Sequence, residues 1–191
     1  MYEAINKGIQ KSSGEVIAIL NSDDFYVNNQ VIEKVMKLFN SRPVDAVYGD
    51  LNYVDKDDIH KVVRKWRSGE YRKDRFLQGW MPPHPAFFIR KTCYQKFGLF
   101  NTAFSISADY ELMLRMLYKH EISCAYLPEV LVNMRTGGKS NMSWKARWKA
   151  NQEDRRAWKI NGLKPGAFTL WMKPLSKLGQ FFGSKAMEAR S

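Results

Sequence analysis

Hydrophobic side chains at the start of the chain recur at helical spacing. Tyr2, Ile5 and Ile9 fall on one face of a helix that the pattern predicts over residues 1–11. The pattern stops at the Ser-Ser-Gly sequence of residues 12–14, where glycine favours the end of a helix. The segment lacks the continuous apolar stretch of a secretory signal peptide.

An apolar run with many β-branched residues follows at residues 15–20. It is too short for a helix, and because it has no polar alternation we expect a strand buried on both faces within a parallel sheet. Residues 29–39 then place apolar side chains on one helical face, Pro43 ends that helix, and residues 45–50 begin another strand. This alternation of helices and strands predicts an α/β fold in layers.

Shorter elements are predicted in the rest of the chain. In chain order they are an edge strand, a short helix, a strand, a short helix, a long helix and two short strands, at residues 59–66, 71–78, 86–89, 91–97, 109–120, 123–126 and 130–135. From residue 143 onward the sequence is typical of helix in two pieces. No apolar run along the chain is long enough to span a bilayer.

Length and composition narrow the class of protein. The chain has 191 residues, of which 45% are hydrophobic, and this fits one folded domain with an appended segment. The same apolar content excludes an intrinsically disordered chain. Two cysteines, Cys93 and Cys124, are too few for a disulfide framework or a cysteine metal cluster, and they suit a reducing compartment.

The net charge of +12 is unevenly distributed along the chain. Residues 1–60 carry 6 basic and 10 acidic side chains, whereas residues 135–191 carry 13 basic and 3 acidic ones. This distribution favours a site for a cation or polar ligand in the first part and contact with an anionic partner in the last part.

Two adjacent carboxylates, Asp23 and Asp24, follow the strand predicted at residues 15–20. In open α/β sheets, ligands bind beyond the carboxyl ends of the strands. Carboxylate oxygens there suit Mg²⁺ or Mn²⁺, which in turn can neutralise a diphosphate. The same pair is equally typical of a turn or of a cap on the following helix.

Further candidates for chemistry lie in the middle of the chain. Asp109 begins the helix predicted at residues 109–120, where a carboxylate can serve as a general base or as an ordinary helix cap. Trp80 and His84 flank a proline-rich loop that could line a sugar pocket, which makes both candidates for binding an acceptor. A lone histidine is nevertheless more often structural than catalytic.

Paired glycines, Gly137 and Gly138, lie between the cationic side chains of Arg135 and Lys139. Such a loop could close over phosphate groups, or it could be a plain surface connection. The chain has no Walker sequence, no Gly-x-Gly-x-x-Gly sequence and no persuasive Ser, His and Asp spacing. A glycine-rich nucleotide-binding loop of those kinds is therefore not supported.

Taken together and in this order, these segments resemble the family 2 glycosyltransferases, which have the GT-A fold. The resemblance covers residues 1–141. The matching segments are residues 1–9, 14–24, 84–88, 98–101, 107–115 and 137–140. It implies a Rossmann-like mixed sheet flanked by helices. It also implies transfer of a sugar, with inversion, from a nucleotide-sugar donor, UDP-linked, to a hydroxyl of a glycan or lipid-linked acceptor.

The same resemblance implies roles for individual residues. Asp24 looks like the metal ligand of a DXD-type pair, holding Mg²⁺ or Mn²⁺, and Asp23 lies nearer the nucleotide sugar. Asp109 looks like the base that deprotonates the acceptor hydroxyl. The loop of residues 135–139 looks like the segment that closes over the donor diphosphate.

Family members begin with a strand and an acidic loop that hold the nucleotide base, and neither precedes Met1. We therefore expect an N-terminally truncated GT-A domain at residues 1–141 and a helical extension at residues 142–191. A non-catalytic remnant or a partner-binding domain is the alternative interpretation.

Basic and aromatic side chains alternate irregularly in residues 143–182, with Trp144, Trp148 and Trp158 among them. This composition favours docking on an anionic membrane surface, and the alternative is a helical pair that packs its apolar stripe on the domain. No nucleic-acid-binding sequence pattern is present, so we expect no nucleic-acid partner. The expected location is cytoplasmic, peripheral on the inner face of the cell membrane.

Overall fold

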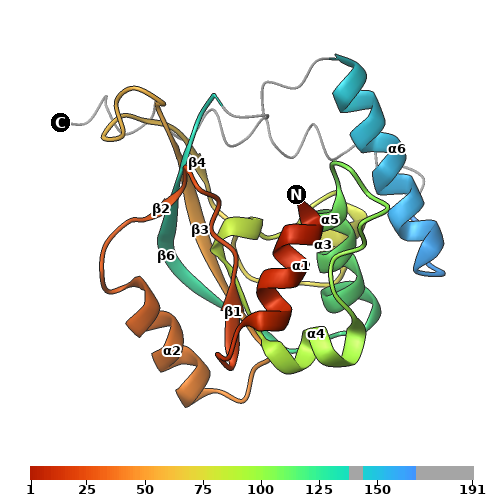
Figure 1. Cartoon of the computed structure of the whole chain (residues 1–191), viewed down its shortest axis with the longest axis horizontal. Helices are drawn as coiled ribbons and strands as arrows, with labels where there is room; N and C mark the ends of the chain where they lie inside the picture. Colours follow the sequence, from red (N-terminus) through yellow and green to blue (C-terminus); the bar gives the residue numbers. More distant parts are fainter. Residues whose placement is uncertain (138–143, 167–191) are drawn as a thin grey trace.

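The computed structural model describes residues 1–137 and 144–166, and it has a curved mixed sheet with helices on both faces (Figure 1). The strands follow the order β1-β5-β3-β6-β2 across the sheet, and β4 pairs with β3 outside this path. The strands are β1 (Val16–Ala18), β2 (Phe25–Tyr26), β3 (Ala46–Val54), β4 (Val62–Trp66), β5 (Phe87–Arg90) and β6 (Cys124–Arg135). The helical segments are α1 (Tyr2–Lys11), α2 (Val31–Ser41), α3 (Asp74–Leu77), η1 (His84–Ala86), α4 (Lys91–Phe97), α5 (Ala108–Met113), η2 (Leu114–Lys119) and α6 (Trp144–Ile160). The predicted α/β class is confirmed.

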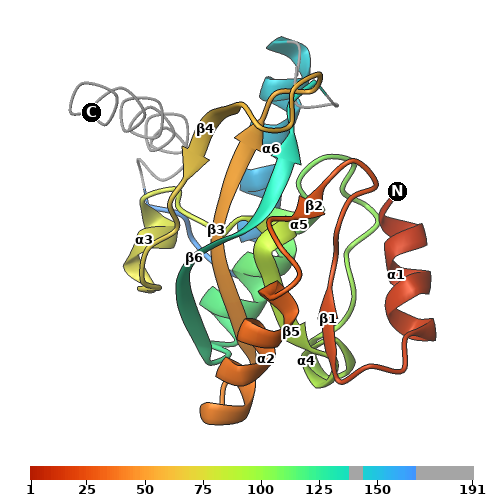
Figure 2. The same cartoon turned by 90° about the vertical axis from the view of Figure 1, so that its left-hand side faces the viewer.

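The parallel strands β3 and β6 form the centre of the sheet. They are paired from Ala46 and Cys124 at one end to Val54 and Arg135 at the other. β5 lies antiparallel on the other side of β3, and β2 lies antiparallel along the end of β6. The carboxyl ends of the two parallel strands therefore meet at one edge of the sheet, near β2, as Figure 2 shows. Ligands bind at such edges in open α/β sheets.

β6 is one continuous strand, whereas the sequence predicts two short ones. Tyr48 of β3 lies opposite Tyr126, but Asp50 lies opposite Val130, so residues 127–129 bulge between the two pairs. The polar and proline residues of this bulge interrupt the apolar pattern without ending the strand. Next to it, a Cβ on Gly49 would lie 2.5 Å from the Leu131 side chain, so the close approach of β3 and β6 requires glycine there.

The prediction that residues 15–20 form a parallel strand buried on both faces was wrong. β1 pairs only with β5 among the described strands, and this pairing is antiparallel. Val16 and Ala18 pack on one hydrophobic cluster, while Ile17 and Ile19 pack on another. The continuous apolar run therefore reflects contacts on the two faces of an edge strand, of which only Ile17 is fully buried.

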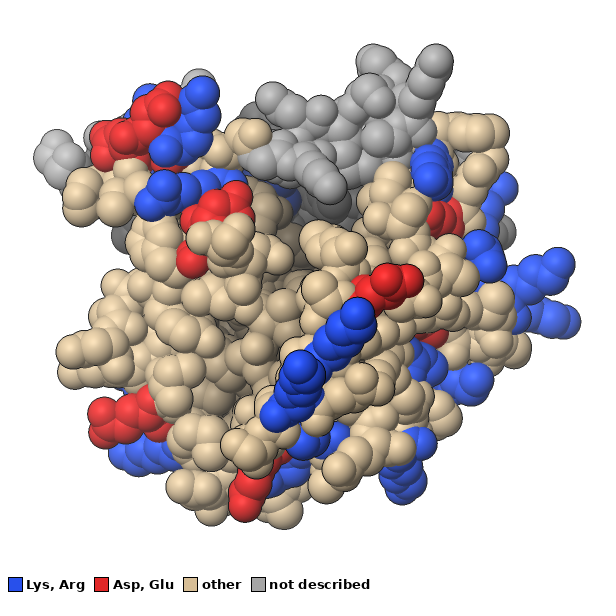
Figure 3. Space-filling model, in the orientation of Figure 1, with Lys and Arg blue, Asp and Glu red and all other residues tan. Residues whose placement is uncertain are grey.

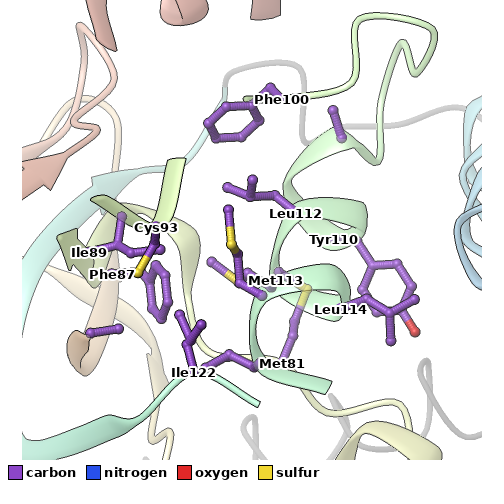
Figure 4. Close-up of a cluster of buried hydrophobic side chains, with 14 of the residues drawn as sticks. Met81, Phe87, Ile89, Cys93, Phe100, Tyr110, Leu112, Met113, Leu114 and Ile122 are labelled. Atoms are coloured by element: carbon purple, nitrogen blue, oxygen red, sulfur yellow. The ribbon is translucent and has the colours of Figure 1, made fainter. Parts of the chain in front are cut away.

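Two hydrophobic clusters cover the two faces of the sheet. The smaller one lies under α2 and includes Val31, Val35 and Phe39. The larger one lies under α1, α4, α5 and η2, and Figure 4 shows part of it. α5 and η2 are continuous and match the helix predicted at residues 109–120, with a π-helical second half. This helix is buried along most of its length because α6 packs against α5 on its outer side.

α6 begins the predicted C-terminal extension and packs on the domain. Trp158 is 0% exposed, and its indole Nε1 donates a hydrogen bond to the Tyr110 hydroxyl at 2.8 Å. The second helical piece and the boundary predicted at residue 141 lie outside the described residues, and that boundary stays a prediction. Across the described ranges, none of the helices has the length and apolar content needed to cross a bilayer.

Candidate functional site

Asp24 lies at the edge where β3 and β6 end. It immediately precedes β2, which pairs with the last part of β6. Its carboxylate is only 8% exposed and accepts a hydrogen bond from the Asn21 side chain at 2.8 Å. Burial raises the pKa of Asp24, and the charge of Asp23 adds to this, while the Asn21 amide and the Arg135 backbone N–H lower it. Asp23 itself is exposed.

Asp109 occupies the first turn of α5, and its side chain is partly exposed. Its negative charge acts on His84 and on the hydroxyls of Tyr2 and Tyr53. Burial raises the pKa of Tyr53, and the charges of both Asp24 and Asp109 raise it further. The two candidate carboxylates, which are far apart in the sequence, thus both act on Tyr53 at the end of β3.

His84 belongs to the one-turn helix η1 and stands edge-on to the Phe100 ring, with the ring centroids 5.7 Å apart. Burial lowers the pKa of His84, while the nearby charge of Asp109 raises it. Its Nε2 atom is enclosed and has no hydrogen-bond partner within residues 1–137 and 144–166. A buried ring nitrogen without a partner is uncommon, and a ligand hydroxyl could satisfy it.

Trp80 is held in an aromatic cluster beside β3. Its indole N–H donates to the Ser68 carbonyl at 2.9 Å, and its ring packs edge-on against Tyr48 and Phe76. The Arg75 guanidinium lies 4.6 Å from the centre of the Trp80 ring. These contacts stabilise the loop that follows β4, and the assignment of Trp80 to the acceptor stays a prediction.

The glycine loop begins where β6 ends. Arg135 is exposed, and its guanidinium lies 5.8 Å from the centre of the Phe25 ring. Phe25 directly follows Asp24 in the chain. Gly137 has a left-handed φ of +103°, and a Cβ there would lie 3.2 Å from the Lys56 side chain. The aliphatic part of Lys56, in the connection between β3 and β4, therefore lies beside the loop, and its ammonium group pairs with Asp57 at 3.8 Å. Gly138 and Lys139 lie outside the described residues.

Three residues near the site carried no recognisable signal of function. Tyr2 donates a hydrogen bond to the Ile106 carbonyl at 2.8 Å, and the charges of both carboxylates act on Tyr53. Glu153 of α6 accepts hydrogen bonds from the segment before Asp109.

The carboxylates at this edge fit a divalent cation that is shared with a substrate. Among the described residues, no three or more His, Cys, Asp or Glu side chains gather closely enough to form a metal cage. Mg²⁺ commonly takes only one or two protein carboxylates and completes its shell with water and substrate phosphates. Burial disfavours the anionic form of Asp24, and a cation held there would offset that cost.

The mixed sheet and its helices are those of GT-A-type glycosyltransferases. The chain matches the model of the family described as Glycosyl transferase family 2 over residues 1–104, and it belongs to this family.

Several proteins are similar to this chain. A PGL/p-HBAD biosynthesis glycosyltransferase of Mycobacterium bovis is 24% identical over 74% of this chain and 53% of its own length. An uncharacterized glycosyltransferase of Mycobacterium tuberculosis is 28% identical over 60% of this chain and 43% of its own length. The structure of S. aureus TarS 1-349 has a TM-score of 0.60 at 11% identity, covering 99% of this chain and 54% of that one. The chain thus spans about half the length of the curated relatives it matches.

Proposed function

We propose that this chain transfers a sugar from a UDP-linked nucleotide-sugar to a hydroxyl of a glycan or lipid-linked acceptor, with inversion at the anomeric carbon. The observation that carries the proposal is the place of Asp24 before β2, at the carboxyl ends of β3 and β6, where the charges of both Asp24 and Asp109 act on Tyr53. Membership in the family supports glycosyl transfer. The similar TarS chain has been solved in complex with UDP-GlcNAc, which supports a nucleotide-sugar donor.

In this reaction Asp109 is the general base. Its carboxylate takes the proton of the acceptor hydroxyl, and the acceptor oxygen forms a bond to the anomeric carbon of the donor. The bond between that carbon and the diphosphate oxygen breaks at the same time, and the diphosphate leaves with the bonding electrons. A single displacement of this kind inverts the configuration of the anomeric carbon.

Asp24, with Asp23 beside it, would hold Mg²⁺ or Mn²⁺. When bound, the cation would stabilise the negative charge of the leaving diphosphate. Arg135 and Lys56 lie next to the glycine loop and would contribute positive charge for the same phosphates. Gly137, with its left-handed backbone, allows the chain to turn there, and Gly138 and Lys139 extend the proposed donor contacts.

On the acceptor side we assign His84 and Trp80. The enclosed Nε2 of His84 has no partner among the described residues and lies in the same environment as Asp109. A neutral imidazole can accept a hydrogen bond from a sugar hydroxyl, and this would orient the acceptor beside the base. Trp80 would contribute an aromatic edge to the same subsite.

Substitution of the two carboxylates tests this function. Asp109→Asn should lower the turnover of a UDP-sugar by about 100-fold or more, because it removes the base. Asp24→Asn should weaken the binding of UDP with Mn²⁺, as measured by calorimetry. Asp45→Asn is the matched control, since Asp45 binds Ser123 at the opposite end of the sheet. Undiminished turnover in both site variants would refute the assignment.

Calorimetry also separates catalysis from the alternative function. If a folded, monodisperse sample of the chain binds neither UDP nor UDP with Mn²⁺, a non-catalytic remnant or a partner-binding domain is favoured. Retained UDP binding that is lost in Asp24→Asn favours the transferase.

We further propose that α6 docks on an anionic membrane surface, which would hold the protein peripherally on the inner face of the cell membrane. Lys149, Arg155 and Lys159 are exposed on α6, and Trp148 is 68% exposed beside them. Blue side chains gather over α6 at the right of Figure 3. Trp158 is buried, so it cannot serve as an anchor in the membrane interface.

A further inference from the structure

The inner face of α6 contacts the segment that leads into α5. The Glu153 carboxylate is 7% exposed and accepts four hydrogen bonds from three consecutive residues. One oxygen accepts from the Ser105 hydroxyl at 2.6 Å and from the Ser105 N–H at 3.1 Å. The other accepts from the N–H groups of Ile106 and Ser107, each at 2.8 Å. Asp109 follows two residues later.

Glu153 binds the three residues that lead into α5 and not the N–H groups of its first turn. The N-cap residue of α5 is Ser107, and within the described residues its side chain makes no capping hydrogen bond. Its hydroxyl instead donates to the Ala150 carbonyl of α6 at 3.4 Å. A carboxylate at this position satisfies free N–H groups and complements the helix dipole. Although burial acts to raise it, the hydrogen bonds lower the pKa of Glu153, which favours the ionised form.

The opposite side of the same segment is held by α1. The Tyr2 hydroxyl donates a hydrogen bond to the Ile106 carbonyl at 2.8 Å, and the Tyr2 ring stacks on Phe100. The backbone N–H groups of Ala108 and Asp109 also lie against the Tyr2 hydroxyl. Residues 105–107 are thus fixed between α1 and α6, immediately before the candidate base.

We infer that Glu153 is a positioning residue for Asp109: it fixes residues 105–107 and through them the orientation of the Asp109 carboxylate toward the acceptor. The inference rests on the proposed function, because it assumes that Asp109 is the base. The inference gives α6 a part in catalysis. The match to the family model does not indicate this part, because it covers only residues 1–104 and α6 lies outside them. A base misplaced by about 1 Å can lose 100-fold in rate.

α6 has other attachments to α5, so the effect of Glu153 on Asp109 can be separated from the docking of the helix. Trp158 binds the Tyr110 hydroxyl at 2.8 Å, and the Asn161 side chain donates to Glu111 at 3.0 Å. These contacts lie on the far side of Asp109 from residues 105–107. Loss of the Glu153 charge should therefore release residues 105–107 while α6 stays in place.

The test compares Glu153→Gln and Glu153→Asp with the full wild-type chain. Glutamine has the same size but turns an NH₂ group toward backbone N–H donors, so we expect kcat to fall about 10- to 100-fold. The KM for the UDP-sugar should stay within about twofold, because the donor site around Asp24 is untouched. Glu153→Asp keeps the charge and should recover part of kcat. A purely structural role would lower the apparent kcat only in proportion to the folded fraction, so kcat per folded molecule would stay at the wild-type value.

Amide hydrogen exchange provides a readout that does not depend on turnover. In Glu153→Gln, residues 105–109 should exchange about tenfold faster or more, while residues 157–161 keep their protection. Asp45→Asn, which removes a carboxylate bound to Ser123, should leave residues 105–109 unchanged. Unchanged exchange at residues 105–109 in Glu153→Gln would overturn the inference, whether or not the wild-type chain transfers sugar. If the wild-type chain is active, an unchanged kcat in Glu153→Gln would also overturn it. If the wild-type chain itself transfers no sugar, this result counts against the proposed function and not against the positioning of residues 105–107 by Glu153.

Discussion

His84 is partly buried, and its enclosed Nε2 atom has no hydrogen-bond partner among the described residues. The imidazole lies against Phe100 and near Asp109, and burial lowers its pKa more than the carboxylate raises it. A histidine that stays neutral in the folded chain but titrates normally in the unfolded chain links stability to pH. This residue therefore offers a test of the site that needs no substrate.

The free energy of unfolding should fall as the pH drops below about 6.5, because the unfolded chain then binds a proton that folded His84 does not. The stabilising contribution is present above the ordinary histidine pKa and is lost below it, with a slope of at most about 1.4 kcal/mol per pH unit. Urea unfolding at several pH values would measure this. His84→Gln should flatten the pH dependence.

His120→Gln is the matched comparison. Burial also lowers the pKa of His120, with contributions from Lys119 and Arg115, but its side chain is exposed. Its removal should flatten the curve less than that of His84. Parallel curves for wild type and His84→Gln would contradict the buried, neutral imidazole.

Within the candidate site, the sequence indicates the carboxylates but not the residues around them, and the role of the carboxylates stays a prediction. Asp23 and Asp24 can be recognised in the sequence because they closely follow an apolar run. Asp109 can be recognised because it begins a strongly periodic helix. Tyr53 and Glu153 cannot be recognised as site residues from the sequence, since each is brought near the site by the packing of segments that are distant in the chain. Local patterns do not encode such contacts.

At the level of elements, α6 is a helix with two different faces. Trp158 and Glu153 point into the protein and bind α5 and the segment before it, while Trp148 and the basic side chains face outward. The composition of this segment predicts the outward face. Its inward contacts depend on where the helix lies in three dimensions (Figure 1).

Matched tryptophan substitutions measure how much the inward face stabilises the fold. Trp158→Ala should lower the free energy of unfolding by about 3–5 kcal/mol, because it leaves a cavity and removes the hydrogen bond to the Tyr110 hydroxyl. Trp148→Ala should change it by less than about 0.5 kcal/mol, since that side chain is 68% exposed. Denaturant unfolding compares the two. Equal losses would mean that α6 does not pack as described.

Prediction of the elements succeeded where periodicity is local. The helices at residues 1–11 and 91–97 agree closely with α1 and α4. The parallel pairing of residues 15–20 was wrong because an apolar run reports burial and carries no information on the partner strand. The break expected before residue 130 marks a bulge in β6, since the central pairing with β3 continues past it.

For the whole molecule, the uneven charge of the chain becomes a distribution in space. The carboxylates Asp23 and Asp24 lie at the end of the sheet, and exposed cations lie along α6. Near an anionic bilayer, each basic residue contributes about 1 kcal/mol of attraction. A few exposed basic side chains on α6 would therefore be enough to support the proposed docking.

Charge reversal on α6 tests this docking. The triple variant Lys149→Glu, Arg155→Glu and Lys159→Glu should weaken binding to vesicles that contain phosphatidylglycerol by about 100-fold. Arg156 is left unchanged because its guanidinium packs on Phe104. Flotation at low and high NaCl measures binding, which salt should screen.

The control reverses three exposed lysines elsewhere, Lys7, Lys11 and Lys37, and so changes the net charge by the same amount. Vesicle binding should largely survive in this control. If the two triple variants float equally, α6 has no special part in membrane docking.

The fixing of residues 105–107 between α1 and α6 also limits how this chain can be recombined with its relatives. A chimera with a crossover at residue 104 would take Tyr2 from one parent and both Ile106 and Glu153 from the other. Tyr2 would then come from a different parent than its contact residue Ile106 and than Glu153. A poor fit among these three residues would displace the candidate base Asp109. A chimera that preserves these contacts has to take residues 2–161, from α1 to Asn161, from a single parent.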